Sequence, residues 1–134
     1  MAAAIINDDG RVLAIRRRDN SHWEPPGGIL DPAETIPEGL AREVMEETGV
    51  TVEIEALTGV YKNMSRGIVA LVFRCRPLDQ PLTSTPEADQ IRWLGIDEIS
   101  THMDEAYAIR ILDALEPGAV QIRAHDGVCV LRER

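Results

Sequence analysis

The chain has 134 residues, of which 44% are hydrophobic and 28% are charged, and its formal net charge is −9. This size and composition suit one soluble domain that spans residues 1–134 around a single core. The negative net charge argues against a nucleic-acid polymer as partner, because binding such a polymer requires a basic surface. No apolar run approaches the roughly 20 residues of a membrane span.

Two strand-like segments open the chain. Residues 2–6 and 12–17 flank Asn7-Asp8-Asp9-Gly10, a turn sequence that predicts a β-hairpin, and residues 19–26 read as a loop. The second strand ends in three arginines, of which Arg17 is best placed to bind a substrate phosphate, because guanidinium matches phosphate oxygens. The alternative interpretation is an ordinary surface arginine.

A helix is predicted to begin near Thr35 and to end at Gly49. The sequence Thr35-Ile36-Pro37-Glu38 offers an N-terminal capping box and an early proline, and a glycine commonly terminates a helix. The segment that precedes this helix contains glycine and proline, and we expect it to be a loop over residues 27–35.

The helical wheel of this segment places acidic side chains near its apolar face. Ile36, Leu40 and Val44 form the stripe that should contact the core. Glu47 falls between Ile36 and Leu40, and Glu43 lies beside Ile36. Because a buried carboxylate is unfavourable unless it is paired or metal-bound, the wheel argues against a plain solvated acidic face.

Three glutamates share one helical face. Glu43, Glu46 and Glu47 have i, i+3, i+4 spacing, which places their side chains within about one turn. Like charges at these spacings repel, and a hard divalent cation would convert the repulsion into a binding site.

The stretch from Gly28 to Val50 resembles the Nudix box, G-x5-E-x7-R-E-U-x-E-E-x-G-U, in which U is a bulky aliphatic residue. Every defined position is matched, by Gly28, Glu34, Arg42, Glu43, Val44, Glu46, Glu47, Gly49 and Val50. A pattern with so many fixed positions is far more specific than a lone glycine motif.

The resemblance implies ligands for Mg²⁺ or Mn²⁺. Glu43, Glu46 and Glu47 are the expected metal ligands, and the backbone carbonyl of Gly27 or Gly28 is expected to complete the shell. Glycine also lets the backbone approach an ion closely. Glu43 is a further candidate for the general base, a role that the family fills in different ways.

The resemblance also implies supporting residues around these ligands. Arg42, counted with the catalytic set, and Glu34 are expected to form an ion pair that positions the glutamates and braces the loop. Beyond the box, Glu87 and Asp89 are candidates for an extra ligand, a base or a substrate contact. A solvated acidic loop is an equally weighted interpretation of these two residues.

The remaining segments predict a mixed sheet and a second helix. Strands are expected over residues 51–57, 67–75 (a central strand) and 91–94, a helix over 103–115, and a last hairpin over 120–124 and 128–131. The fold class is α/β, and the resemblance implies a Nudix-type three-layer α/β/α sandwich with a mixed β-sheet. Cys75 and Cys129 lack metal-ligand spacing and are predicted to be free buried thiols of a cytoplasmic protein.

Taken together, the resemblance implies a Nudix pyrophosphohydrolase. Such an enzyme uses a metal ion to hydrolyse the pyrophosphate linkage in a nucleoside diphosphate linked to another group, by attack of water on phosphorus. Nucleoside triphosphates, sugar nucleotides and ADP-ribose fit about equally well as the small-molecule substrate, and a homodimer is compatible with the family. The alternatives are a non-hydrolysing nucleotide-binding module and an acidic interaction domain that uses metal only structurally.

Overall fold

The computed structural model describes residues 1–132. In chain order its elements are β1 (Ala2–Ile5), β2 (Val12–Arg17), β3 (Trp23–Glu24), α1 (Ile36–Thr48), β4 (Val52–Asn63), β5 (Ile68–Pro77), β6 (Ala88–Leu94), α2 (Ile96–His102), α3 (Glu105–Leu115), β7 (Gln121–His125) and β8 (Val130–Leu131). The loop that the sequence predicts over residues 19–26 therefore contains the short strand β3.

The strands form two sheets. The larger sheet is mixed and has the order β1-β5-β4-β7-β8, in which β1 runs parallel to β5 and β4 runs parallel to β7. The smaller sheet is antiparallel and has the order β3-β2-β6. As predicted, β5 is an interior strand, flanked by β1 and β4.

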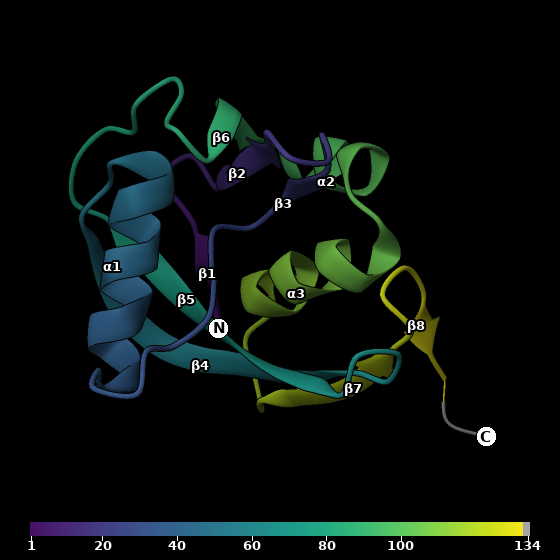
Figure 1. Ribbon diagram of the computed structural model, residues 1–134. Coiled ribbons are helices and arrows are strands. Elements are labelled where there is room, and N and C mark those ends of the chain that lie inside the picture. Colours follow the sequence, from purple (N-terminus) through teal and green to yellow (C-terminus); the bar gives the residue numbers. More distant parts are fainter. Residues whose placement is uncertain (133–134) are drawn as a thin grey trace.

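The helices cover opposite faces of the larger sheet. Successive side chains of a strand point to opposite faces, and in β1 Ala3 packs in the core cluster that contains Leu40 of α1. The next residue, Ala4, packs in the cluster that contains Ala114 of α3. Figure 1 shows β1 and β5 between α1 on one side and α3 on the other. The expected three-layer α/β/α architecture with a mixed sheet is thus confirmed.

The N-terminal hairpin prediction is wrong. The turn itself forms, with the Gly10 N–H donating to the Asn7 carbonyl at 3.0 Å. However, β1 pairs with β5, β2 pairs with β3 and β6, and only one isolated bridge joins Ile6 to Val12. All four residues of β1 are buried, so both faces of this strand must pack against other elements. In the larger sheet, α1 packs on one face of β1 and α3 packs on the other.

Helix α1 forms almost as predicted. The Thr35 hydroxyl accepts a hydrogen bond from the Glu38 N–H at 3.3 Å, and Gly49 ends the helix in the left-handed conformation at φ 76°. Leu40 and Val44 are fully buried. Ile36 is 37% exposed, so its place in the buried stripe is wrong; it is the first residue of the helix.

Three other boundaries differ from the sequence predictions. The helix expected over residues 103–115 is found as α3, which begins at Glu105, and the sequence prediction missed the preceding helix α2, which Gly95 and Glu98 cap through reciprocal hydrogen bonds of 3.0 Å. Strand β4 continues to Asn63, and β6 begins three residues earlier than expected, at Ala88. The last hairpin is confirmed by the antiparallel pair β7 and β8.

The two cysteines have different environments. Both are free, but only Cys75 is buried, and Cys129 is exposed in the turn that precedes β8. The prediction of two buried thiols is therefore wrong for Cys129, which lies just before the short strand β8 and next to the exposed Val128.

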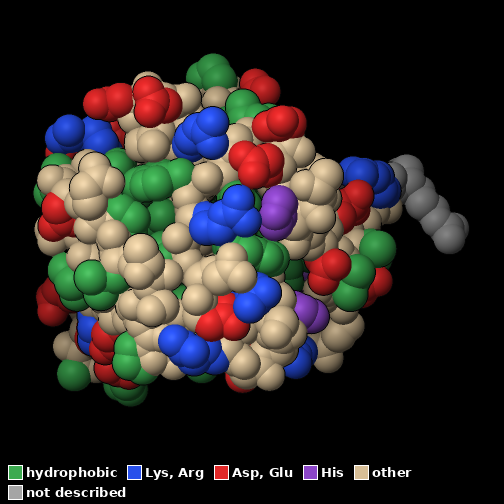
Figure 2. All heavy atoms as spheres, turned by 90° about the horizontal axis from the view of Figure 1, so that it is seen from above, with side chains coloured by type: hydrophobic (Ala, Val, Ile, Leu, Met, Phe, Trp, Pro, Cys, Tyr) green, Lys and Arg blue, Asp and Glu red, His purple; other side chains and the backbone are tan. Residues whose placement is uncertain are grey.

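The surface carries no continuous basic field on the face drawn in Figure 2, where Lys and Arg side chains are interspersed with Asp and Glu side chains. Within residues 1–132, no helix is long and apolar enough to cross a membrane.

Candidate active site

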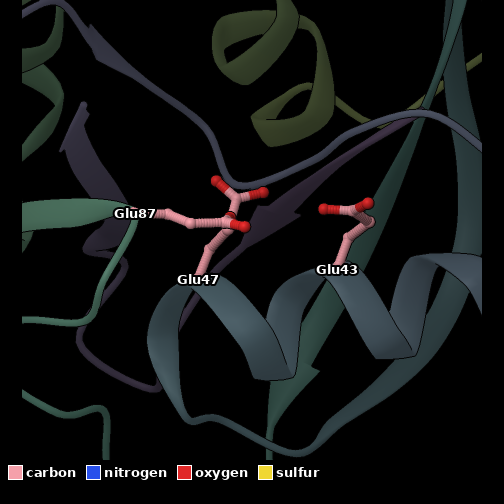
Figure 3. Close-up of side chains that lie close together, drawn as sticks. All are labelled: Glu43, Glu47 and Glu87. Atoms are coloured by element: carbon pink, nitrogen blue, oxygen red, sulfur yellow. The ribbon is translucent and has the colours of Figure 1, made fainter. Parts of the chain in front are cut away.

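Three carboxylates converge at the end of the smaller sheet. Glu43 and Glu47 project from successive turns of α1, and Glu87 projects from the residue before β6. One carboxylate oxygen from each lies within 4.8 Å of the others, and Figure 3 shows the side chains of Glu47 and Glu87 pointing toward one another with Glu43 beside them. We call this group the carboxylate cluster.

Glu47 is the buried member of the carboxylate cluster. It is 5% exposed, and its Oε1 accepts a hydrogen bond from the Gly27 N–H at 3.0 Å. The pKa of Glu47 is raised to about 8, mainly by burial; the hydrogen bond from the Gly27 N–H lowers it, and the neighbouring charges of Glu43, Glu87 and Glu24 raise it. The cluster therefore favours a neutral Glu47 when no cation is bound.

This burial predicts an unusual pH dependence for the metal-free protein. Between the ordinary glutamate pKa of 4.5 and about 8, folded Glu47 retains a proton that the unfolded chain releases. The free energy of unfolding should therefore fall as pH rises through this window. With about 1.4 kcal/mol per pKa unit, the melting temperature in EDTA should drop by several degrees between pH 5 and pH 8.

The matched measurement is thermal melting of Glu47→Gln over the same pH range. The variant cannot titrate at this position, so its melting temperature should be nearly flat where that of the wild type falls. Identical pH slopes for both proteins would contradict this account of the cluster.

Arg42 links the helix to the loop that precedes it. Its guanidinium donates to Glu34 at 2.6 and 2.8 Å, to Glu43 at 2.9 Å and to Glu46 at 3.3 Å. Arg42 lowers the pKa of Glu34 to about 2, with help from the backbone N–H of Asp31. The ion pair that the sequence predicted is present, and it holds Glu43 at the edge of the carboxylate cluster.

Glu46 lies outside the carboxylate cluster. Its side chain is 47% exposed and contacts Arg42. The cluster that the structure forms from residues 1–132 consists of Glu43, Glu47 and Glu87, so two of the three predicted helical ligands are brought together. The metal-binding role of all these residues remains a prediction.

The two glycines that precede the helix are closely packed, Gly28 against the Glu43 carboxylate and Gly27 against the backbone of Ala2. A Cβ on Gly28 would lie 2.5 and 2.6 Å from the carboxylate oxygens of Glu43, and a Cβ on Gly27 would lie 2.7 Å from the Ala2 Cα. Neither glycine has a positive φ, so close approach explains glycine at these positions. Figure 3 shows this loop passing beside the carboxylates.

The structure separates the two acidic candidates beyond the box. Glu87 joins the carboxylate cluster, whereas Asp89 forms a two-pronged ion pair with Arg16, with both nitrogen–oxygen distances at 2.8 Å. Asp89 lies within β6 and its partner within β2, so this pair ties two neighbouring strands together and places Asp89 outside the cluster.

A cleft of about 530 Å³ contains the carboxylate cluster, and we call it the carboxylate cleft. Arg17 and Arg18 line it together with Glu24. Arg17 is partly neutralised, because it donates to Asp19 at 2.6 Å and to Glu24 at 3.4 Å. The predicted phosphate-binding arginine is therefore at the cleft, beside two charged residues that the sequence did not single out, Arg18 and Glu24.

A second cavity of about 410 Å³ adjoins the carboxylate cleft, and we call it the arginine cavity. The two spaces share a wall made of Arg17, Glu24, Gly27, Gly28 and Ile29. Tyr107 and Arg110 of α3 line the arginine cavity, and no sequence motif pointed to them. A small molecule that occupies both spaces would extend from the three carboxylates to α3.

Comparisons with known proteins agree with this geometry. The NUDIX domain family matches residues 1–115. A MutT-like protein of Streptomyces ambofaciens is 54% identical over 95% of this chain and 82% of its own length. A putative 8-oxo-dGTP diphosphatase of Bacillus subtilis is 38% identical over 43% of this chain and 39% of its own length. The crystal structure of an ADP-ribose pyrophosphatase from Streptococcus suis superposes with a TM-score of 0.77 at 20% identity, covering 90% of this chain and 95% of that one.

Proposed function

This chain belongs to the NUDIX family and is a pyrophosphohydrolase, and we propose that it uses Mg²⁺ or Mn²⁺ to hydrolyse a nucleoside diphosphate linked to another group. The proposed substrates are nucleoside triphosphates, sugar nucleotides and compounds of the ADP-ribose type. Relatives named for 8-oxo-dGTP and for ADP-ribose support this range without narrowing it.

The carboxylate cluster is the single observation that carries the metal proposal. Three carboxylates from separate turns and loops converge on one point, and one of them is buried with a raised pKa. Carboxylate oxygens are the ligands that Mg²⁺ and Mn²⁺ prefer. The donor set therefore fits a hard divalent cation, whose positive charge would offset the burial and the like charges that keep Glu47 protonated.

Glu46 and the glycine carbonyls remain in the proposed ligand set. Glu46 neighbours Glu47 on α1, and its 3.3 Å hydrogen bond is the longest that Arg42 makes to a glutamate. When bound, the metal would neutralise charge on the phosphate oxygens and orient them for attack by water.

The surrounding residues hold this arrangement in place. The Gly27 N–H fixes the Glu47 carboxylate, and Arg42 fixes Glu43. Arg17 and Arg18 flank the cleft where the phosphates of a substrate would lie, and guanidinium groups suit that contact.

The experiment that tests the proposal measures hydrolysis of a panel of compounds. Products released from nucleoside triphosphates, sugar nucleotides, ADP-ribose and dinucleoside polyphosphates are quantified with Mg²⁺, with Mn²⁺ and with EDTA. We expect metal-dependent cleavage of at least one class. Stabilisation by nucleotides with no cleavage of any compound would instead favour the non-hydrolysing binding module.

A pair of substitutions separates Glu87 from Asp89. Glu87→Gln should lower turnover by about 10-fold or more at limiting Mg²⁺, because the cluster loses a charged ligand. Asp89→Asn should leave turnover within about threefold and lower the melting temperature, because it weakens the ion pair with Arg16. Steady-state kinetics across a Mg²⁺ titration would show the difference, and a larger kinetic effect for Asp89→Asn would refute the assignment.

A further inference from the structure

Arg110 is a buried cation without a carboxylate partner among residues 1–132. It is 9% exposed, and its guanidinium lies between the rings of Tyr61 and Tyr107, at 5.5 and 4.9 Å from their centres. Aromatic faces attract a cation, but they accept no conventional hydrogen bonds from its five N–H groups. Burial lowers the pKa of Arg110, although the charge of Glu24, which is not in ion-pair contact with it among the described residues, acts in the opposite direction.

The hydrogen bonds of Arg110 are also incomplete. Its Nε is buried and has no partner within the described residues. Its Nη2 lies 3.3 Å from Nε2 of His125, whose Nδ1 already accepts a hydrogen bond from the Gly127 N–H at 3.0 Å. Burial keeps the pKa of His125 low, and a neutral imidazole has one proton.

That single proton means that the two contacts of His125 cannot both be hydrogen bonds. If Nδ1 accepts from Gly127, then Nε2 carries the proton and faces Arg110 as a second donor. If Nε2 accepts from Arg110, then the Gly127 N–H loses its acceptor. The fold is therefore at least one acceptor short around Arg110, an unfavourable arrangement for buried donors.

Arg123, by contrast, has a carboxylate partner. Arg123 donates to both carboxylate oxygens of Asp113 at 2.8 Å, and the Tyr61 hydroxyl donates to the same carboxylate at 2.7 Å. Asp113 lies three residues from Arg110 on α3, yet it serves Arg123. The fold thus contains a suitable carboxylate close by and leaves Arg110 without it.

Arg110 lines the arginine cavity, which shares a wall with the carboxylate cleft. We propose that Arg110 binds an oxyanion, a phosphate or carboxylate of the substrate that is separate from the hydrolysed pyrophosphate. This inference rests on the proposed function, because it takes the carboxylate cleft as the position of the phosphates. The guanidinium fork matches either oxyanion, and such a ligand supplies both the charge and the acceptors that the fold lacks.

The test uses ligands that contain no pyrophosphate, so it measures binding even if the proposed hydrolysis fails. For phosphate, AMP is compared with adenosine 2′,5′-bisphosphate and adenosine 3′,5′-bisphosphate. For carboxylate, uridine 5′-monophosphate is compared with orotidine 5′-monophosphate. Dissociation constants are measured by calorimetry with Mg²⁺ present. Because the protein carries a net charge of −9, its overall field disfavours the more anionic member of each pair.

We expect at least one anionic ligand to bind about 10-fold or more tightly than its parent, which is the usual effect of a charged hydrogen bond. Arg110→Gln should remove this preference and leave the parent's affinity within about threefold. Arg110→Lys keeps the positive charge but lacks the paired N–H donors of the guanidinium, so it should show an intermediate preference. This variant replaces Arg110→Gln in the test if the glutamine variant does not fold. Arg76→Gln, which alters an exposed arginine paired with Glu53, is the control.

Equal binding within every pair by the wild-type protein would overturn the inference, as would a preference that persists in Arg110→Gln. Hydrolysis of the substrate panel without any oxyanion preference would leave the proposed function intact and refute only the role of Arg110. An oxyanion preference without hydrolysis of any compound in the panel would support the role of Arg110 and refute the proposed hydrolysis.

Discussion

Glu47→Gln should lower turnover by about 1,000-fold while leaving the protein folded, since a metal ion contributes several kcal/mol to stabilising a reacting phosphoryl group. The amide can still accept the hydrogen bond from the Gly27 N–H, so the loop should keep its place. What is lost is the negative charge at the centre of the carboxylate cluster. In the metal-free state at pH 8 the variant should even melt at a higher temperature, because it buries no group that tends to ionise.

The control for this substitution is Glu55→Gln. Glu55 is a glutamate on β4 whose only ion pair is a 3.5 Å contact with Arg74 among the described residues. Its loss should leave turnover within about twofold, as for most surface changes. Turnover of Glu47→Gln near the wild-type level would show that this carboxylate does not serve the reaction.

Gly28→Ala should reduce turnover by about 100-fold with little change in melting temperature. The added Cβ would lie 2.5 and 2.6 Å from the Glu43 oxygens, so one of the two groups must move. The carboxylate is at the end of a flexible side chain, and its displacement is easier than movement of the backbone. Even a small misplacement of a group that positions the reaction can lower the rate this much.

Gly10→Ala provides the opposite control. Gly10 has φ +75° with no atom near its Cβ position, so alanine there should cost about 1–2 kcal/mol of stability through backbone strain alone. The turn lies away from the carboxylate cleft, and turnover should not change. Equal kinetic effects from the two substitutions would rule out a specific role for the close approach at Gly28.

The sequence predicted best where local chemistry decides the structure. The cap at Thr35 and the glycine stop at Gly49 act within a few residues of the helix ends, and both are found. The helical wheel also predicted correctly that Glu47 lies on the apolar face of α1, because its side chain is buried in the structure. The same argument applied to α3 places Arg110 on the face of Tyr107 and Ala114, so this buried cation was detectable from periodicity.

Long-range pairing decided what the sequence could not predict. The turn at Asn7–Gly10 has hairpin chemistry, yet β1 finds its partner in β5, some 70 residues away in the register that pairs Ala2 with Val72. Glu87 and Asp89 look equivalent in sequence. Only the pairing of β2 with β6 shows that Arg16 engages Asp89 and leaves Glu87 to the carboxylate cluster.

The most direct test of the central claim measures Mn²⁺ occupancy and turnover in the same samples. Bound Mn²⁺ is quantified by electron paramagnetic resonance while product release from the best substrate of the panel is followed. We predict that turnover rises in proportion to bound Mn²⁺ in the wild-type protein, and that both are lost in Glu47→Gln. Full turnover after removal of the ion, or unchanged Mn²⁺ occupancy in Glu47→Gln, would contradict a catalytic metal site at Glu43, Glu47 and Glu87.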